Sequence, residues 1–271
     1  MNRLIALDMD GTLLTDQKEI TPRTKNALSR AMDGGAAVAL ISGRPLFGMT
    51  WAARALSLNT RGGYLSACNG ALIVDAKSGE CLQKRFAERE TVNPILSEAQ
   101  ALGLVTIGYD EANASVMASD ADNAFARYEA RWNFAPIRVT DLAVDRVSSP
   151  LYLVCGTPER LNPFFVHASV LAQGRVQLLR GAPDFFYIGA PNADKGDAAA
   201  FLLDMLHLPP SALIAFGDSM NDLGLIRRAG LGIAMGNACE ALKSAARHIA
   251  KDNEQDGVAD ALEQFVLQGA I

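Results

Sequence analysis

The chain has 271 residues, enough for one large domain or a core with an inserted domain, and its 49% hydrophobic and 20% charged residues are typical of a globular protein. A net charge of −5 argues against nucleic acid as the main partner, although a small anionic substrate remains compatible with it. No apolar run approaches the length of a membrane span, and Asp8 interrupts the N-terminal apolar run too early for a signal peptide, so we expect no membrane association.

The first predicted strand, Leu4 to Leu7, is followed by Asp8, Asp10 and then Gly11, which ends the strand. Residues at alternate positions of an extended chain point to the same side. Two close carboxylates repel each other, and burying them unpaired is costly, so we expect a cation or a proton beside them. Oxygen ligands at this density suit Mg²⁺. A polar turn that only ends a strand is an alternative, whereas the position of the glycine disfavours a calcium loop of the EF-hand kind.

Strands and helices then alternate, as in a parallel α/β sheet. A Thr-Pro pair predicts a helix over residues 22–32. A second buried strand, 36–41, runs directly into Ser42 and Gly43, and a third is expected over 64–67. A hydroxyl and a glycine amide at the end of a strand can both donate to a phosphate oxygen, although a simple strand-to-helix turn would use the same residues.

The pattern changes after residue 86, where strands and helices are grouped rather than alternating. The elements predicted in this section are strands near 105–109, 115–118, 151–155, 176–179 and 185–188, and helices near 91–102, 121–132 and 159–173. Such grouping indicates a separate α+β unit. We therefore expect a core of residues 1–84 and 187–271, with an inserted α+β unit of residues 85–186.

The alternation returns at Lys195, which begins a helix that ends near residue 207. An apolar strand over 212–216 then leads into a polar run that contains Asp218, Asn221 and Asp222. The last predicted elements are a helix over 223–229, a strand over 231–235 and a terminal helix over 258–267.

Ligands of parallel α/β sheets gather beyond the carboxyl ends of the strands. Four polar elements occupy such ends or the start of an adjoining helix, namely Asp8 with Asp10, Ser42 with Gly43, Lys195, and Asp218 with Asn221. Together they suit phosphoryl transfer, in which positive charge and positioning matter most. Mg²⁺ and the lysine would supply charge, one carboxylate could attack phosphorus, and the second could protonate the leaving alcohol and then activate water.

The remaining polar residues give less support to other chemistries. The four cysteines, Cys68, Cys81, Cys155 and Cys239, show neither Cys-x-x-Cys pairing nor zinc spacing, so we expect buried thiols in a reducing, cytoplasmic compartment. Three histidines offer weak support for a histidine-centred mechanism.

Taken in order, the motifs Asp8-Met-Asp-Gly-Thr, Ser42-Gly-Arg-Pro, Lys195-Gly and Gly217-Asp-Ser-Met-Asn-Asp resemble those of the haloacid dehalogenase superfamily. The second aspartate points to its phosphatase branch. The large insert, together with Cys68-Asn-Gly-Ala and the stretch from Asn253 to Val258, is similar to the Cof-like class IIB members. The resemblance implies a Rossmann-like core with an α+β cap that closes over the site.

The resemblance also implies roles for individual residues. Asp8 would be the nucleophile and a Mg²⁺ ligand, and Asp10 the general acid and base, binding the metal through its backbone carbonyl. Asp218 would be a further metal ligand, with Asp222 supporting the metal site. The phosphoryl group would be bound by Met9 (through its amide), Ser42, Gly43, Lys195 and Asn221. The family often has a small residue or asparagine before the lysine, where this chain has Asp194.

The substrate expected from the resemblance is a small phosphorylated metabolite, with sugar phosphates as the default and pyridoxal phosphate, nucleotides and phosphoglycolate as alternatives. A phosphomutase could use the same aspartyl-phosphate. A phosphate-responsive module of the receiver-domain kind is a rival from another class, but receiver domains are much shorter and lack a second carboxylate placed for hydrolysis. The residues therefore favour turnover over signalling.

Overall fold

The computed structural model describes residues 3–267, which divide into two compact units. Within the described residues, the first unit comprises residues 3–43, Thr50–Gln83 and residues 194–267. The second comprises Arg44–Met49 and Lys84–Ala193. Each unit has its own sheet and its own hydrophobic core, as expected of a separate domain.

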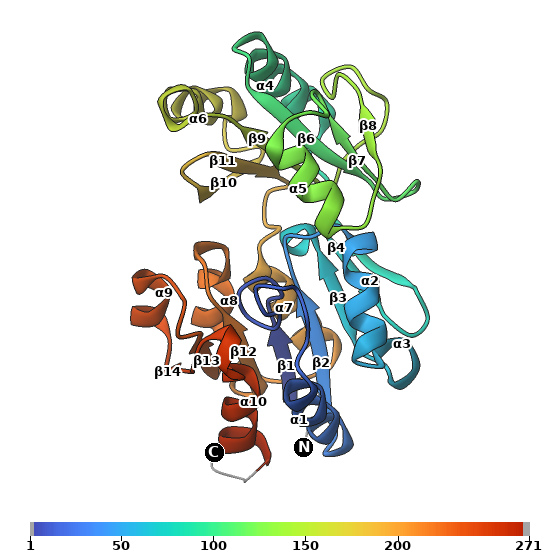
Figure 1. Cartoon of the computed structure of the whole chain (residues 1–271), viewed down its shortest axis with the longest axis vertical. Coiled ribbons are helices and arrows are strands. Elements are labelled where there is room, and N and C mark those ends of the chain that lie inside the picture. Colours follow the sequence, from blue (N-terminus) through green and yellow to red (C-terminus); the bar gives the residue numbers. More distant parts are fainter. Residues whose placement is uncertain (1–2, 268–271) are drawn as a thin grey trace. The chain divides into compact units, whose positions relative to one another are not determined.

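The sheet of the first unit has eight strands within the described residues, in the order β14-β13-β12-β1-β2-β3-β4-β5 (Figure 1). These are β1 (Arg3–Leu7), β2 (Ala36–Ile41), β3 (Tyr64–Ala67), β4 (Leu72–Asp75), β5 (Cys81–Lys84), β12 (Leu213–Gly217), β13 (Leu231–Ala234) and β14 (His248–Ile249). The pairings from β14 to β3 are parallel, and β4 is antiparallel to β3. Because β2 and β12 both pair in parallel with β1, all three strands end at the same edge of the sheet.

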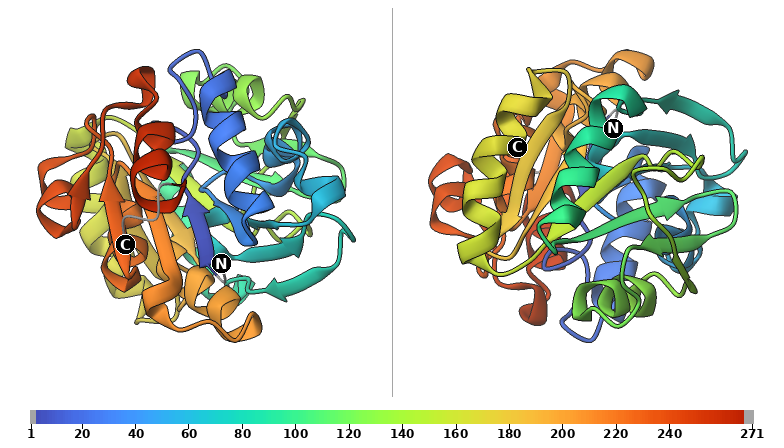
Figure 2. Two further views of the ribbon diagram at one scale, coloured as in Figure 1. Left: turned by 90° about the horizontal axis from the view of Figure 1, so that it is seen from below. Right: turned by 90° about the horizontal axis from the view of Figure 1, so that it is seen from above.

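Helices cover both faces of this sheet, which explains why β1 and β2 are apolar at nearly every position. The helices of the first unit are α1 (Pro22–Asp33), α2 (Leu46–Ala55, which belongs to this unit from Thr50 on), α3 (Leu58–Arg61), α7 (Lys195–Met205), α8 (Leu223–Arg228), α9 (Glu240–Ala245) and α10 (Gly257–Leu262). Figure 2 (left) shows α1 and α10 on one face and α7 on the other. The Thr21 hydroxyl accepts from the backbone N–H of Thr24, so this residue caps α1 as predicted.

The second unit contains a six-stranded sheet in the order β10-β11-β9-β6-β7-β8. Its strands are β6 (Val105–Asp110), β7 (Ser115–Ala118), β8 (Ile137–Val139), β9 (Leu151–Cys155), β10 (Gln177–Ala182) and β11 (Phe185–Gly189), and its helices are α4 (Arg89–Ala101), α5 (Ala124–Trp132) and α6 (Pro158–Ala172). Only β7 and β8 pair in parallel. Apolar faces of α4 and α6 pack on this sheet around Ile95, Phe164 and Phe186. The unit is therefore of the α+β kind.

The predicted α/β class is confirmed, with β2, β3, β7 and β9 observed at the predicted bounds. The short elements α3, β8, α9 and β14 were not predicted. The strand β11 continues to Gly189, which pairs with Leu151, so the predicted boundary between 186 and 187 falls inside a strand of the second unit.

Two smaller expectations have separate outcomes. None of the four cysteines forms a disulfide, but the prediction that all are buried holds only for Cys68 and Cys155. Cys81 is exposed on the edge strand β5, and Cys239 is partly exposed. No helix in residues 3–267 is both long and apolar enough to cross a membrane.

Candidate active site

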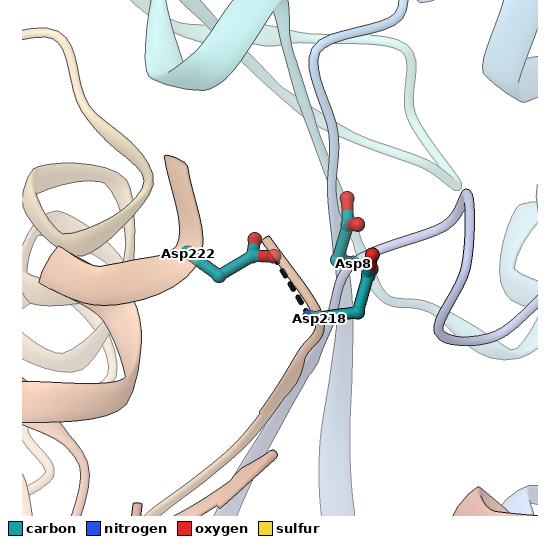
Figure 3. Close-up of side chains that lie close together, drawn as sticks. All are labelled: Asp8, Asp218 and Asp222. Carbon is teal, nitrogen blue, oxygen red and sulfur yellow. Dashed lines mark hydrogen bonds between the residues drawn. The ribbon is translucent and has the colours of Figure 1, made fainter. Parts of the chain in front are cut away.

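The polar residues that follow β1 and β12 lie side by side, because these two strands are neighbours. Leu7 is in register with Phe216, and the backbone N–H of Asp8 donates to the Phe216 carbonyl at 3.1 Å. Asp8 and Asp218 therefore follow adjacent strand ends, and Figure 3 shows their carboxylates close together, with Asp222 directed toward them from the next turn. One carboxylate oxygen from each of the three lies within 4.8 Å of the others.

Lys195 joins two of these carboxylates from the first position of α7. Its Nζ donates to Asp8 Oδ1 and to Asp222 Oδ1, each at 2.6 Å, and only 1% of the lysine is exposed. The other oxygen of Asp222, Oδ2, accepts from the backbone N–H groups of Asp218 and Ser219, both at 3.0 Å. Asp222 thus holds both the lysine and the turn that carries Asp218.

The charges of this cluster do not balance. Burial raises the pKa of Asp8 well above its usual range, and the nearby charge of Asp222 raises it further, while Lys195 opposes the shift. Burial and the Asp222 charge likewise raise the pKa of Asp218 to about 6. Burial alone would lower the pKa of Lys195, but the carboxylates of Asp222 and Asp8 raise it, so the lysine stays protonated. Three carboxylates against one ammonium leave a buried excess of negative charge that a cation would neutralise.

The donor set at this point suits a hard divalent cation. Carboxylates of Asp8 and Asp218 come from two adjacent strand ends, and the Thr12 hydroxyl fixes one of them by donating to Asp218 Oδ1 at 2.8 Å. Gly11 lies directly against the same side chain, with a φ of +77°, and a Cβ there would lie 2.7 Å from Asp218 Oδ2. Gly11 and Thr12 of the first motif therefore position the carboxylate of Asp218, which lies more than 200 residues away in the sequence.

Asp10 lies differently from the other aspartates of the motifs. Its side chain is 36% exposed and forms an ion pair with Lys18 Nζ at 2.8 Å. Among the described residues, the carboxylates close enough to share a cation are those of Asp8, Asp218 and Asp222, without Asp10. The carboxylate cluster therefore contains Asp222 and not the side chain of Asp10, for which the motif interpretation expects a metal contact through the backbone carbonyl only.

The predicted phosphoryl-binding residues all belong to the first unit. Ser42 and Gly43 follow β2 directly, and Ser42 is buried, with its carbonyl accepting from the Asn69 N–H at 2.9 Å. Met9 is buried beside Asp8. The side chain of Asn221 donates from Nδ2 to Asn69 Oδ1 at 3.1 Å. Together with Lys195, these residues surround the ends of β1 and β2.

The sequence model of the haloacid dehalogenase-like hydrolases matches residues 5–262. The chain belongs to the haloacid dehalogenase-like hydrolase family. The resemblance inferred from the four motifs, including the Cof-like class, is confirmed over both units.

Similarity to individual members of the family extends over whole chains. YxeH of Bacillus subtilis is 30% identical over 98% of this chain and 99% of its own. The 5-amino-6-(5-phospho-D-ribitylamino)uracil phosphatase YcsE of the same organism is 29% identical, with 98% and 96% covered. A haloacid dehalogenase-like hydrolase from Bacteroides thetaiotaomicron superposes with a TM-score of 0.89 at 32% identity, covering 97% of this chain and 99% of its own. This member of the family is thus an enzyme of the phosphoric monoester hydrolase type.

The residue before the motif lysine, in which this chain departs from the family pattern, has a local role. Asp194 is the N-cap of α7, and its Oδ1 accepts from the backbone N–H of Asp197 at 2.6 Å. The aspartate therefore fixes the first turn of the helix that presents Lys195. This capping role could be predicted from the sequence, because aspartate is a preferred residue at the N-cap of a helix.

Proposed function

We propose that this haloacid dehalogenase-like hydrolase is a Mg²⁺-dependent phosphatase that works through an aspartyl-phosphate on Asp8. The observation that carries the proposal is the contact of Lys195 Nζ with both Asp8 and Asp222, beside the carboxylate of Asp218. This arrangement supports a site in which the carboxylates bind a metal ion and the ammonium of Lys195 provides a fixed positive charge for the phosphoryl group. Bound Mg²⁺ would reduce the repulsion between the anionic nucleophile and the anionic ester.

In the first half-reaction, an oxygen of Asp8 attacks phosphorus, and the bond from phosphorus to the ester oxygen breaks. Asp10 gives its proton to the departing alkoxide, which leaves as an alcohol. An ammonium has three N–H bonds, and the two ion pairs of Lys195 use two of them. The third can donate to a phosphoryl oxygen, with Ser42, Gly43, Met9 and Asn221 binding the others.

In the second half-reaction, Asp10 takes a proton from water, and the water oxygen attacks phosphorus. The bond from Asp8 to phosphorus breaks, which releases inorganic phosphate and restores the carboxylate. Hydrolysis therefore needs a second carboxylate that can exchange protons with the leaving group and with water, and the partly exposed Asp10 is accessible for this.

For the substrate we propose a small phosphorylated metabolite of the sugar phosphate kind. YcsE acts on a ribityl phosphate, a phosphate ester on a sugar-derived chain. We further propose that the first unit is the catalytic core and that the second unit, as the cap, selects the alcohol part of the substrate. Phosphate release over a panel of sugar phosphates, pyridoxal phosphate, nucleotides and phosphoglycolate, with Mg²⁺ and with a chelator, tests the proposal. Release of phosphate without an isomerised phosphorylated product separates a phosphatase from a phosphomutase.

Replacing Asp10 with alanine is expected to lower kcat by about a hundredfold to ten-thousandfold, because general acid–base catalysis is lost. Binding of Mg²⁺, measured by calorimetry, should change little, since the Asp10 carboxylate lies outside the cluster of Asp8, Asp218 and Asp222. Loss of metal binding together with activity would show that this side chain is a metal ligand instead of a proton carrier. Lys18→Met, which removes the ion pair of Asp10 and keeps its carboxylate, is the control for a change in surface charge.

Mg²⁺ is expected to raise the thermal midpoint Tm more at about pH 7.5 than at about pH 5. The pKa of Asp218 is about 6 in the folded chain against 3.8 ordinarily, so the folded state binds a proton more tightly and its stability falls as pH rises through this range. Above pH 6 the ionised Asp218 carboxylate can bind a cation, whereas below it a proton competes. Thermal unfolding with and without MgCl₂ at both pH values measures the difference, and an equal shift at both would contradict a metal held by these carboxylates.

A further inference from the structure

The turn that follows β3 holds Asn69 in an uncommon conformation. Cys68, Asn69 and Gly70 all have positive φ, at 52°, 55° and 103°, although only one of the three is glycine. Gly70 packs against the start of α7, where a Cβ on it would lie 2.6 Å from the Asp194 carbonyl oxygen. The turn is thus fixed against the helix that carries Lys195. Asparagine tolerates the left-handed region better than most residues, but three in succession show that the surroundings hold this turn in place.

The side chain of Asn69 reaches over the ends of two strands. Asn69 follows β3 and Asn221 follows β12, and β2 and β1 lie between these strands in the sheet. Three strand spacings amount to about 14 Å, yet the Asn221 Nδ2 donates to Asn69 Oδ1 at 3.1 Å. The two loops therefore meet above the ends of β1 and β2, where Asp8 and Ser42 lie. A backbone hydrogen bond, from the N–H of Asn69 to the Ser42 carbonyl, also holds Asn69 in this position.

The side-chain amide nitrogen of Asn69 is a hydrogen-bond donor for which the described part of the first unit supplies no acceptor. Only 3% of Asn69 is exposed, and its Nδ2 is buried with no hydrogen-bond partner among residues 3–267. A buried donor without an acceptor is costly, and such groups are ordinarily satisfied by protein, water or a ligand. Asn69 itself contacts Ser42 and Asn221, and its neighbour Gly70 packs against Asp194 at the start of α7.

We propose that Asn69 is a further phosphoryl-binding residue of this site, whose Nδ2 donates to an oxygen of the substrate's phosphoryl group. Its Oδ1 at the same time fixes the amide of Asn221, so that the two side chains act as a pair across the strand ends. The inference rests on the proposed phosphatase function and deepens it, because it adds a neutral donor to the charged lysine. A neutral donor there would bind the phosphoryl oxygens without adding to the charge that the metal and lysine already supply.

Two variants and a matched control test this. Asn69→Asp keeps the shape of the side chain and an acceptor for Asn221 but removes the donor and adds a negative charge. Asn69→Gly removes the side chain without penalty at positive φ. Asn59→Asp makes the same chemical change on the exposed surface of α3, which precedes β3 and so lies at the opposite end of the sheet. Binding of inorganic phosphate to the Mg²⁺-loaded protein is measured by calorimetry, with kcat and KM alongside.

We expect phosphate affinity to fall about tenfold to a hundredfold in Asn69→Asp and about tenfold in Asn69→Gly, with Asn59→Asp unchanged. Asn69→Gly removes the donor without adding charge, so an unchanged phosphate affinity in this variant would overturn the proposal. An unchanged affinity in Asn69→Asp, which keeps the acceptor for Asn221, would overturn it as well. Wild-type protein that bound no phosphate would also overturn it. Failure of the phosphatase function is seen separately, as wild-type protein that binds phosphate but releases none from any ester.

Discussion

Replacing Asp8 with asparagine is expected to abolish phosphate release, with a loss of about ten-thousandfold or more in kcat. An amide oxygen in this position cannot form the aspartyl-phosphate, while the side chain keeps its shape between Lys195 and the end of β1. The measurement is phosphate release from the best substrate of the panel, with trapping of the phosphorylated wild-type enzyme by rapid quenching as a second readout. The variant should yield no such adduct.

The stability of Asp8→Asn separates loss of chemistry from loss of structure. Because burial and the Asp222 charge raise the pKa of Asp8, its ionised form is held at a cost, and a neutral amide removes that cost. We therefore expect a Tm at least equal to that of the wild type at about pH 7.5 in the absence of Mg²⁺. Turnover that persists in a preparation shown by mass to contain no aspartate at position 8 would remove this residue from the nucleophile role.

Replacing Lys195 with methionine is expected to have the largest combined effect on stability and activity. The lysine is buried against Asp8 and Asp222, and its loss leaves two buried carboxylates without their cation. Breaking a buried pair in this way costs about 3–5 kcal/mol in the free energy of unfolding. Activity should fall as well, because the fixed positive charge on the phosphoryl oxygens is lost.

Urea unfolding at two pH values tests the electrostatic origin of this effect. Without the ammonium the carboxylates take up protons more readily, so the stability deficit of Lys195→Met should shrink as pH falls from about 7.5 to about 5. Lys243→Met is the matched control, since its ion pair with Glu240 is on the surface, where the carboxylate is 89% exposed, and such pairs contribute about 1 kcal/mol or less. Equal losses in the two variants would contradict the buried cluster.

The sequence was informative wherever a short apolar run ended in polar residues. Runs such as 36–41 can be assigned from hydrophobicity alone, because strands buried on both faces show no alternation. That Asp8, Ser42 and Asp218 lie at one edge of the sheet follows from parallel pairing. The short elements β8 and β14 escaped prediction, since two or three residues carry no periodic signal.

Contacts between distant turns could not be predicted from the sequence. The ion pair of Lys195 with Asp222 and the hydrogen bond of Asn69 with Asn221 depend on where separate loops meet above the sheet. Motif order identifies the residues but not which oxygen or nitrogen each one uses. For Asn69, the asparagine-glycine pair after a strand favours a left-handed turn, and this could be predicted. The burial of its side-chain amide could not be predicted from that pair.

The place of β1 between β2 and β12 has a consequence for biosynthesis. As the polypeptide leaves the ribosome, β2 is available within some thirty residues to cover one side of β1, but β12 begins only at Leu213. Until then the other side of the central strand presents unpaired backbone and apolar side chains, a template for intermolecular aggregation. The nascent protein therefore depends on slow, long-range strand pairing, and translation products that stop before β12 should be prominent clients of chaperones and proteases.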